Sequence, residues 1–240
     1  YMHVCFVLEN YKLKSESFSS PITIQQLASH TSGLSYSFVP GPVGAMYIAE
    51  EMERGLGNVP SAGGEFFTEG TKPPFGNLRE WTKALAELPL VAQPGTVWNY
   101  SVGMDVLGAL IEEVSGMTFG EFLKERIFSP LGMEDTGFIV PEEKLNRFAA
   151  NYSPTPDNMM LMDDPEKSGY RTPPQLESGG GGLVSTVGDY LKFAQMLLNR
   201  GEYQGKRYLG KKTVKFMTAN HMGSVSADEG LTNLFNMLGS

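Results

Sequence analysis

Two hydroxyl side chains stand next to each other at Tyr100 and Ser101, and Val102 follows them. A serine hydroxyl is a poor nucleophile until a base removes its proton. A tyrosine hydroxyl has a pKa of about 10, so it acts as a base only where nearby cations depress that pKa. Taken alone, a tyrosine is usually a packed residue with a hydrogen-bonded hydroxyl, and the chain contains ten of them. The surrounding motifs therefore decide how this pair is interpreted.

A second unusual stretch is the glycine run Gly179–Gly182, which precedes Ser185 and Thr186. Four consecutive glycines are more than a helix cap requires. From the residues alone, the run is a flexible loop ahead of a helix that Thr186 caps, with Asp189 three positions later. No chemistry follows from it without further context.

Helical patterns dominate the elements that must position these stretches. The clearest helix is expected at 104–114, directly after Val102, with an apolar stripe that should make it the best-buried helix. That stripe consists of Leu107, Leu110, Ile111 and Val114. Thr23 with Gln26, and Thr118 with Glu121, form capping boxes that begin two further helices. Other helices are expected at 43–54, from Asn77 to Pro89, at 190–198 and at 213–219.

Few strands are expected. Alternating residues predict strands at 138–140 and 148–152, and a small hairpin at 203–209. Residues 4–8 fit a short buried strand or a loop, whereas 57–76 and 153–178 are typical of long loops. The chain does not alternate strand and helix as a parallel α/β sheet would.

Composition excludes several classes of function. The 240 residues carry a net charge of −8, which argues against a general nucleic-acid or anionic-membrane binder because no basic surplus is available. Cys5 is the only cysteine and there are three histidines, so no intrachain disulfide is possible and the chain is poor in zinc ligands. No motif implies a metal or an organic cofactor. No apolar run reaches membrane-spanning length. The compartment stays open.

Five short motifs occur in an order and spacing that resemble one family of serine hydrolases. They are Pro21–Leu27 leading into Ser29–Leu34, Pro94–Thr96 before Tyr100, Asp105–Gly108, Pro130–Met133, and the glycine run leading to Thr186. Each is weak alone, but together they resemble the group of class C β-lactamases, penicillin-binding proteins and family VIII carboxylesterases. The resemblance implies an α+β fold, with an antiparallel sheet flanked by helices and an all-helical region.

The resemblance also implies catalytic roles. In that family the serine of a Ser-x-x-Lys motif is acylated, while the lysine and the tyrosine of a Tyr-x-Asn motif share the proton transfer. Tyr100 would take this role, with Ser101 orienting its neighbours. Val102 replaces the asparagine that holds the substrate amide in β-lactamases, which favours esters over β-lactams. The glycines would form part of the substrate-binding wall, at Gly180, Gly181 and Gly182.

One element of the family pattern is missing, because no serine in this chain has a lysine three residues later. We therefore expect residues 1–240 to be a partial domain, inactive alone, with the nucleophile upstream and the third motif and remaining sheet downstream. The preferred function is hydrolysis of small-molecule esters. Alternatives are a β-lactamase or D-amino-acid peptidase of the same fold, acting on amides, and a non-catalytic binding protein that kept the fold. Oligomeric state is not indicated.

Three motif-like stretches are interpreted as structural. Lys167–Gly169 has the letters of the family's third motif but precedes the glycine run, whereas the genuine motif follows it. His221–Gly223 closes the last expected helix. His30 lies at a helix end, where a histidine can bond to backbone carbonyls and interact favourably with the helix dipole.

Overall fold

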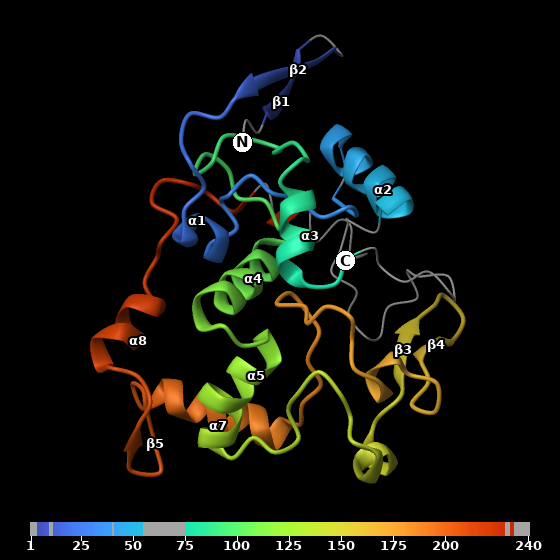
Figure 1. The fold of residues 1–240 in the computed structure, drawn as a ribbon, viewed down its shortest axis with the longest axis vertical. Helices are drawn as coiled ribbons and strands as arrows, with labels where there is room; N and C mark the ends of the chain where they lie inside the picture. The colour runs from blue at the N-terminus through green and yellow to red at the C-terminus, as the bar shows by residue number, and fades with distance from the viewer. Residues whose placement is uncertain (1–3, 10–11, 40, 55–74, 229–230, 233–240) are drawn as a thin grey trace.

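The computed structural model describes residues 4–9, 12–39, 41–54, 75–228 and 231–232. The loop expected at 57–76 lies almost entirely outside these residues. Among the described residues, helices form most of the regular structure, and Figure 1 shows them arranged between a hairpin at one end and α7 with β5 at the other.

Four of the α-helices in the described residues, α1, α3, α5 and α7, begin where the sequence places a capping side chain. Thr23 Oγ1 accepts the Gln26 amide at 3.2 Å, and Asn77 Oδ1 accepts the Glu80 amide at 2.9 Å. The α-helices are α1 (Ile24–Ala28), α2 (Pro42–Arg54), α3 (Leu78–Leu85), α4 (Gly103–Ser115), α5 (Phe119–Leu123), α6 (Ser129–Leu131), α7 (Val187–Leu198) and α8 (Lys211–Met217). A π-helical segment, Lys124–Phe128, joins α5 to α6, and short 3₁₀ helices span Glu142–Arg147 and Gly169–Arg171.

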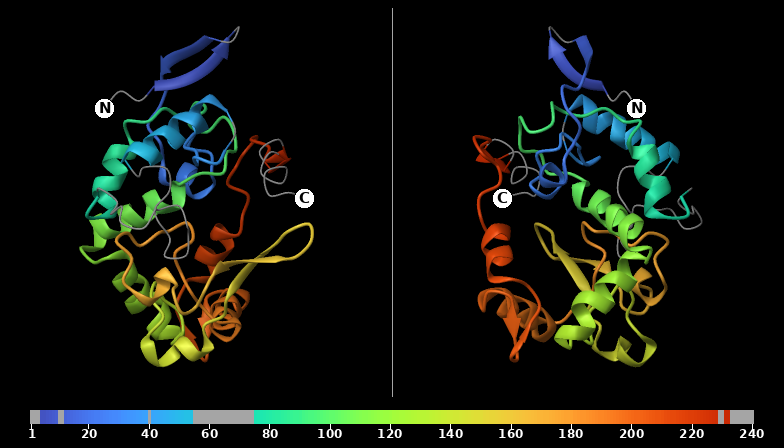
Figure 2. Two further views of the ribbon diagram at one scale, coloured as in Figure 1. Left: turned by 90° about the vertical axis from the view of Figure 1, so that its right-hand side faces the viewer. Right: turned by 60° about the vertical axis from the view of Figure 1, so that its left-hand side comes forward.

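Within the described residues the strands form three separate two-stranded antiparallel sheets. They are β1 (Val4–Glu9) with β2 (Lys12–Ser17), β3 (Asn151–Pro154) with β4 (Met159–Asp163), and β5 (Glu202–Tyr203) with β6 (Lys206–Arg207). Residues 4–8 are thus a strand, and the small hairpin near 203–209 is confirmed. Figure 2 shows the β1–β2 and β3–β4 hairpins extending from the helical body.

One strand prediction and part of one loop prediction were wrong, and the strand expected at 148–152 begins only at Asn151, as β3. Residues 138–140 form no strand, because this segment makes a single bridge, Gly137 with Val184, and then turns so that the Val140 amide donates to the Tyr170 carbonyl at 2.8 Å. Part of the loop expected at 153–178 is the strand β4. The local cause is a turn in which Thr155 Oγ1 donates to the Asn158 carbonyl at 2.8 Å and sets the hairpin register.

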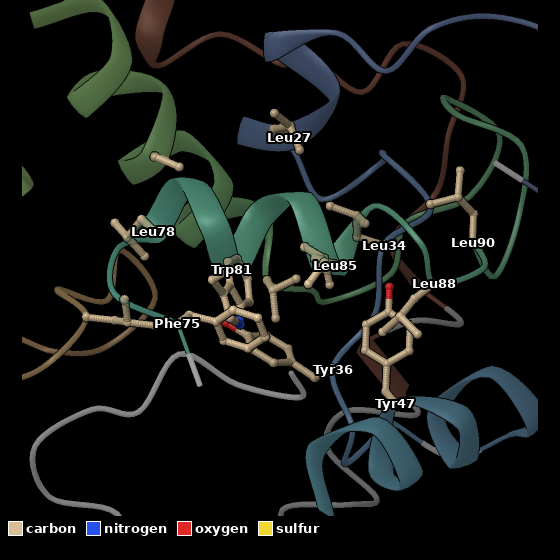
Figure 3. Close-up of a cluster of buried hydrophobic side chains, with 14 of the residues drawn as sticks. Leu27, Leu34, Tyr36, Tyr47, Phe75, Leu78, Trp81, Leu85, Leu88 and Leu90 are labelled. Carbon is tan, nitrogen blue, oxygen red and sulfur yellow. The ribbon is translucent and has the colours of Figure 1, made fainter. Parts of the chain in front are cut away.

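The best-buried helix is α3 rather than α4, which corrects the expectation from the apolar stripe. Its side chains Leu78, Trp81, Ala84 and Leu85 are all buried, and they dominate the cluster shown in Figure 3. In α4 the buried residues include Gly108 and Ala109, and a Cβ on Gly108 would lie 3.4 Å from Leu78. Small residues therefore form the α4 contact face. The three stripe residues at 107, 110 and 111 are half-buried, and Val114 is 79% exposed.

Candidate active site

Tyr100 lies at the end of the segment that leads into α4, half-buried among aromatic rings. Its ring centroid is 5.0 Å from that of His30 and 5.1 Å from that of Tyr36. Trp98 and Phe38 complete the group at 6.4 Å each. The cluster joins two stretches that are about seventy residues apart in the sequence.

Asn99 fixes this segment beside the chain that follows α1. Its side-chain Nδ2 donates to the Leu34 carbonyl at 2.7 Å, and its backbone amide donates to the His30 carbonyl at 2.8 Å. Because Asn99 directly precedes Tyr100, these two bonds fix the backbone next to Tyr100 in addition to the contacts of its ring.

Ser101 is fully buried and meets His30, with 3.4 Å between Ser101 Oγ and His30 Nδ1. Burial lowers the pKa of the His30 imidazole, which favours the neutral ring. A neutral imidazole can donate or accept, so it can orient the serine hydroxyl. Sequence reasoning treated His30 as a helix ending. The structure does place it after α1, with a left-handed φ of 54°, but also against both predicted catalytic residues.

Val102 has no exposed surface and belongs to the core cluster that also contains Leu27 of α1 and the buried side chains of α3. Its amide donates to the Ser35 carbonyl at 3.4 Å, and it begins α4 without a side-chain cap. The side chain offers no hydrogen-bond donor at this position. Its influence on substrate choice stays a prediction, based on the absence of a donor and not on a direct contact.

The glycine run docks on the first turn of α4. Gly180 N donates to Asp105 Oδ1 at 3.1 Å, and a Cβ built on Gly180 would lie 2.8 Å from the Tyr36 hydroxyl oxygen. A Cβ on Gly182 would lie 2.8 Å from the Phe138 ring, whereas one on Gly181 would meet nothing within 4 Å. The run therefore approaches Tyr100 through Tyr36.

Two residues of this arrangement had no assigned role in the sequence analysis. Asp105 is 1% exposed, and burial raises the pKa of its carboxyl despite hydrogen bonds from Ser178 and from the glycine run. Burial, the Asp105 charge and the Tyr100 hydroxyl together raise the pKa of Tyr36. An ionisable residue in the first turn of an apolar helix was the available signal for Asp105.

The role of the glycine run as part of a substrate-binding wall near Tyr100 stays a prediction. A cavity of about 580 Å³ lies beside α5 and the segment from Gly132 to Phe148; Glu177 and Val184–Thr186, which border the glycine run, line it, but Tyr100 and the glycines themselves do not. Among the described residues, no three histidine, cysteine, aspartate or glutamate side chains gather as metal ligands would. No described helix combines the length and apolar character needed to cross a membrane.

The stretches interpreted as structural have structural contacts. Ser168 is buried, donates to Asp163 at 2.9 Å and caps the 3₁₀ helix by accepting the Tyr170 amide. His221 bonds through Nε2 to the Phe216 carbonyl at the end of α8. Ser168 therefore stabilises the start of a 3₁₀ helix, and His221 stabilises the end of α8.

Comparison with known proteins shows the family of the chain. The Beta-lactamase family model matches residues 13–239. Esterase EstB of Burkholderia gladioli is 31% identical over 186 residues, covering 71% of this chain and 43% of EstB. Lovastatin esterase of Penicillium rubens is 30% identical over 227 residues, covering 91% of this chain and 49% of that enzyme.

A solved structure gives the same result for the fold. EstCE1, described as a hydrolase with promiscuous acyltransferase activity, superimposes with a TM-score of 0.66 at 26% identity, over 85% of this chain and 52% of that one. The chain thus spans about half the length of the relatives it matches. The α+β fold predicted from the motifs is confirmed, and the chain belongs to the Beta-lactamase family.

Proposed function

We propose that the protein is a serine hydrolase that cleaves small carboxylic esters, and that this chain contributes Tyr100 as its proton-transferring residue. The observation that carries the proposal is the setting of Tyr100, half-buried at the start of α4 and flanked by Tyr36 and His30. The esterases EstB and lovastatin esterase among its relatives support the reaction class.

The proposed reaction has two acyl-transfer steps. A serine oxygen bonds to the ester carbonyl carbon while Tyr100 takes the serine proton, and that proton then passes to the departing alcohol. Water next attacks the acyl-serine, releasing the carboxylic acid and restoring the serine hydroxyl. Because this chain has no Ser-x-x-Lys sequence, the acylated serine and its lysine would come from a segment other than these 240 residues.

The other predicted residues support this step from the side. Ser101, held by His30, keeps the Tyr100 segment in register. Val102 leaves the site without an amide donor, which suits esters because their carbonyl groups need less activation than amides. Gly180, Gly181 and Gly182 would border the acyl or alcohol group, with Gly181 facing the most open space.

A second acceptor is favoured by one relative. EstCE1 is a hydrolase with promiscuous acyltransferase activity. In the proposed mechanism, an alcohol in place of water on the acyl-serine gives a new ester by the same bond changes. We therefore include acyl transfer between small esters and alcohols as a side activity of the proposed hydrolase.

The test compares substrates on the complete protein that carries this chain. Short-chain p-nitrophenyl esters should be hydrolysed with a higher kcat/KM than a chromogenic cephalosporin, because Val102 offers no donor to a lactam side-chain amide. The 240-residue chain alone should hydrolyse neither. A preference for the cephalosporin would refute the ester assignment, and an intact protein that binds esters without turnover would favour the non-catalytic alternative.

A further inference from the structure

Asp105 is a buried charge that the proposed mechanism does not use. It is the third residue of α4 and only 1% exposed. Among the residues that the structure describes, no lysine or arginine forms an ion pair with it. Burying a carboxylate without a cation is costly unless hydrogen bonds compensate. The hydrogen-bond donors to the Asp105 carboxylate therefore indicate the role of this residue.

Those donors belong to the glycine run and the residue before it. Ser178 Oγ donates to Asp105 Oδ1 at 2.7 Å, and Gly180 N donates to the same oxygen at 3.1 Å. The backbone of the run is close to α4 as well, because a Cβ on Gly179 would lie 2.2 Å from the Met104 carbonyl oxygen. The carboxylate thus clamps the run onto the first turn of α4.

The clamp also sets the position of Tyr36. A Cβ on Gly180 would lie 2.8 Å from the Tyr36 hydroxyl oxygen and 3.0 Å from Asp105 Oδ2, so the three groups meet where a methyl group has no room. Burial, the Asp105 charge and a hydrogen bond with Tyr100 raise the pKa of Tyr36. Its hydroxyl is therefore protonated near neutral pH, so it can donate a hydrogen bond beside Tyr100, whose ring centroid is 5.1 Å away.

We propose that Asp105 is a positioning residue, which together with Ser178 holds Gly180 against Tyr36 and so fixes the Tyr36 hydroxyl on Tyr100. A donor fixed on the Tyr100 oxygen stabilises negative charge that develops there during proton transfer. The catalytic consequence rests on the proposed function. The clamp itself is a property of the folded chain and can be measured without a substrate.

The experiment compares four variants in the complete protein. Asp105→Ala removes both acceptor contacts, whereas Asp105→Asn keeps an oxygen for Ser178 and Gly180. Ser178→Ala removes a donor to Asp105 and also the second acceptor of the Gly180 amide. Its matched control is Ser168→Ala, which removes a buried serine with a similar bond to Asp163, away from Tyr100. The measurements are amide hydrogen exchange at Gly180 and, on a p-nitrophenyl ester, kcat and KM.

In Asp105→Ala we expect Gly180 exchange to rise at least about tenfold, because the amide loses its carboxylate acceptor and keeps only Ser178 Oγ, at 3.1 Å, which is then no longer held by Asp105. We expect kcat to fall about 10- to 100-fold with KM changed less than about threefold, since misplaced catalytic groups reduce turnover more than binding. Asp105→Asn should restore both values to within about threefold of wild type, because its oxygen still accepts. Ser178→Ala should move in the same direction as the alanine variant, and Ser168→Ala should change neither value.

Two results would overturn the inference. One is unchanged Gly180 exchange in Asp105→Ala. The other is raised exchange with normal kcat, which would make the clamp irrelevant to Tyr100. If Asp105→Ala does not fold, Ser178→Ala against Ser168→Ala decides by the same two measurements. If the wild-type protein hydrolyses no ester, the proposed function fails, and Gly180 exchange still decides whether Asp105 holds the run.

Discussion

Two aspartates in this molecule perform the same structural task in different electrostatic surroundings. Asp105 is the third residue of α4 and Asp189 is the third residue of α7, and both are buried. A carboxylate in the first turn of a helix interacts favourably with the helix dipole. Each also accepts a hydroxyl and an amide from a distant loop, Ser178 and Gly180 for Asp105, and Thr136 and Asp135 for Asp189.

The difference is a cation. Lys192 Nζ lies 2.9 Å from Asp189 Oδ1. Burial alone would raise the pKa of the Asp189 carboxyl, but Lys192, the Asp135 amide and Thr136 together hold that pKa below its usual range. Burial raises the pKa of Asp105, which has Tyr36 as a neighbour instead of a lysine. The paired aspartate is thus a stable anchor, and the unpaired one lies where Tyr100 is expected to transfer protons.

The largest expected effect is a loss of kcat from a change in the Tyr100 region, with no loss from a matched change in the Asp189 region. Tyr100→Phe removes only the hydroxyl, so we expect kcat of the complete enzyme to fall about 10²- to 10⁴-fold, the usual contribution of general acid–base catalysis. Ser101→Ala should cost less, because Ser101 only orients its neighbours. Tyr190→Phe in the exposed part of α7 is the control and should be silent. Kinetics and melting temperatures of the three variants provide the measurement.

A Tyr100→Phe enzyme with a normal melting temperature and normal kcat would refute the catalytic role that distinguishes the Tyr100 region from the Asp189 region. Tyr100 would then be a packed tyrosine, and the Asp105 region would be an anchor like that of Asp189.

The second effect concerns glycines in the two regions. Gly180→Ala inserts a methyl between Tyr36 and Asp105, so it should lower the free energy of unfolding by about 1–3 kcal/mol through overpacking. Gly188→Ala near Asp189 meets only Thr186 Oγ1, at 3.9 Å, and should be neutral or stabilising by up to about 1 kcal/mol. Urea unfolding of the chain measures both. Equal stability of the two variants would mean that the run is not docked as tightly as the Asp105 clamp requires.

Much of this architecture was predictable because it depends on local chemistry. Capping residues Thr23, Asn77, Thr118 and Thr186 begin helices where the sequence indicated, since a side-chain acceptor beside unpaired amides acts within a few residues. The order of motifs also identified the family correctly. These signals need no knowledge of distant contacts.

The burial of α4 was not predictable in the same way. Its apolar stripe is clear in the sequence, but the neighbours of a helix face depend on tertiary packing, which selected Gly108 and Ala109 for the close contacts. The role of Asp105 was missed for a related reason. Its partners Ser178 and Gly180 are more than seventy residues away, and no local pattern reports a bond over that distance.

The third effect is a difference in pH dependence. The folded-state pKa of Asp105 is raised above its unfolded value of about 3.9. The contribution of Asp105 to the free energy of unfolding is therefore full below about pH 3.9, and it is lost as the pH rises through the folded-state pKa. For Asp189 the folded-state pKa is lowered. The contribution of Asp189 to the free energy of unfolding is therefore full above about pH 3.9, and it is lost as the pH falls through the folded-state pKa. Asp105→Asn should therefore destabilise most in acid, and Asp189→Asn most at neutral pH.

Urea unfolding between about pH 3 and pH 7 measures both differences against wild type. The groups that face each carboxyl are part of the expectation: Tyr36 for Asp105, and Lys192 with the more distant Arg147 for Asp189. If the loss of unfolding free energy changes with pH in the same way for both variants, the surroundings of the two aspartates do not differ as the geometry implies.

The smallest expected effect tests whether Lys192 alone accounts for the opposite pKa shifts of Asp105 and Asp189. Lys192→Met keeps most of the side-chain length but removes the cation, while the Asp135 amide and Thr136 hydroxyl still donate to Asp189. Burial should then raise the pKa of Asp189 toward the behaviour of Asp105. We expect a slightly lower melting temperature at pH 7, partly because the Lys192 bond to the Gly132 carbonyl is also lost. The exposed Lys212→Met serves as the control for loss of a positive charge.

The decisive quantity is the coupling between Lys192 and Asp189, obtained from Lys192→Met, Asp189→Asn and the double variant. In the wild-type background the Asp189→Asn penalty should shrink as pH falls, because protonation removes the ion pair. In the Lys192→Met background that penalty should already be smaller at pH 7 and change less with acid. An unchanged pH dependence would mean that the amide and hydroxyl donors alone keep Asp189 ionised. The absence of a lysine would then not explain why Asp105 behaves differently, and the aromatic surroundings of Tyr36 and Tyr100 would have to account for it.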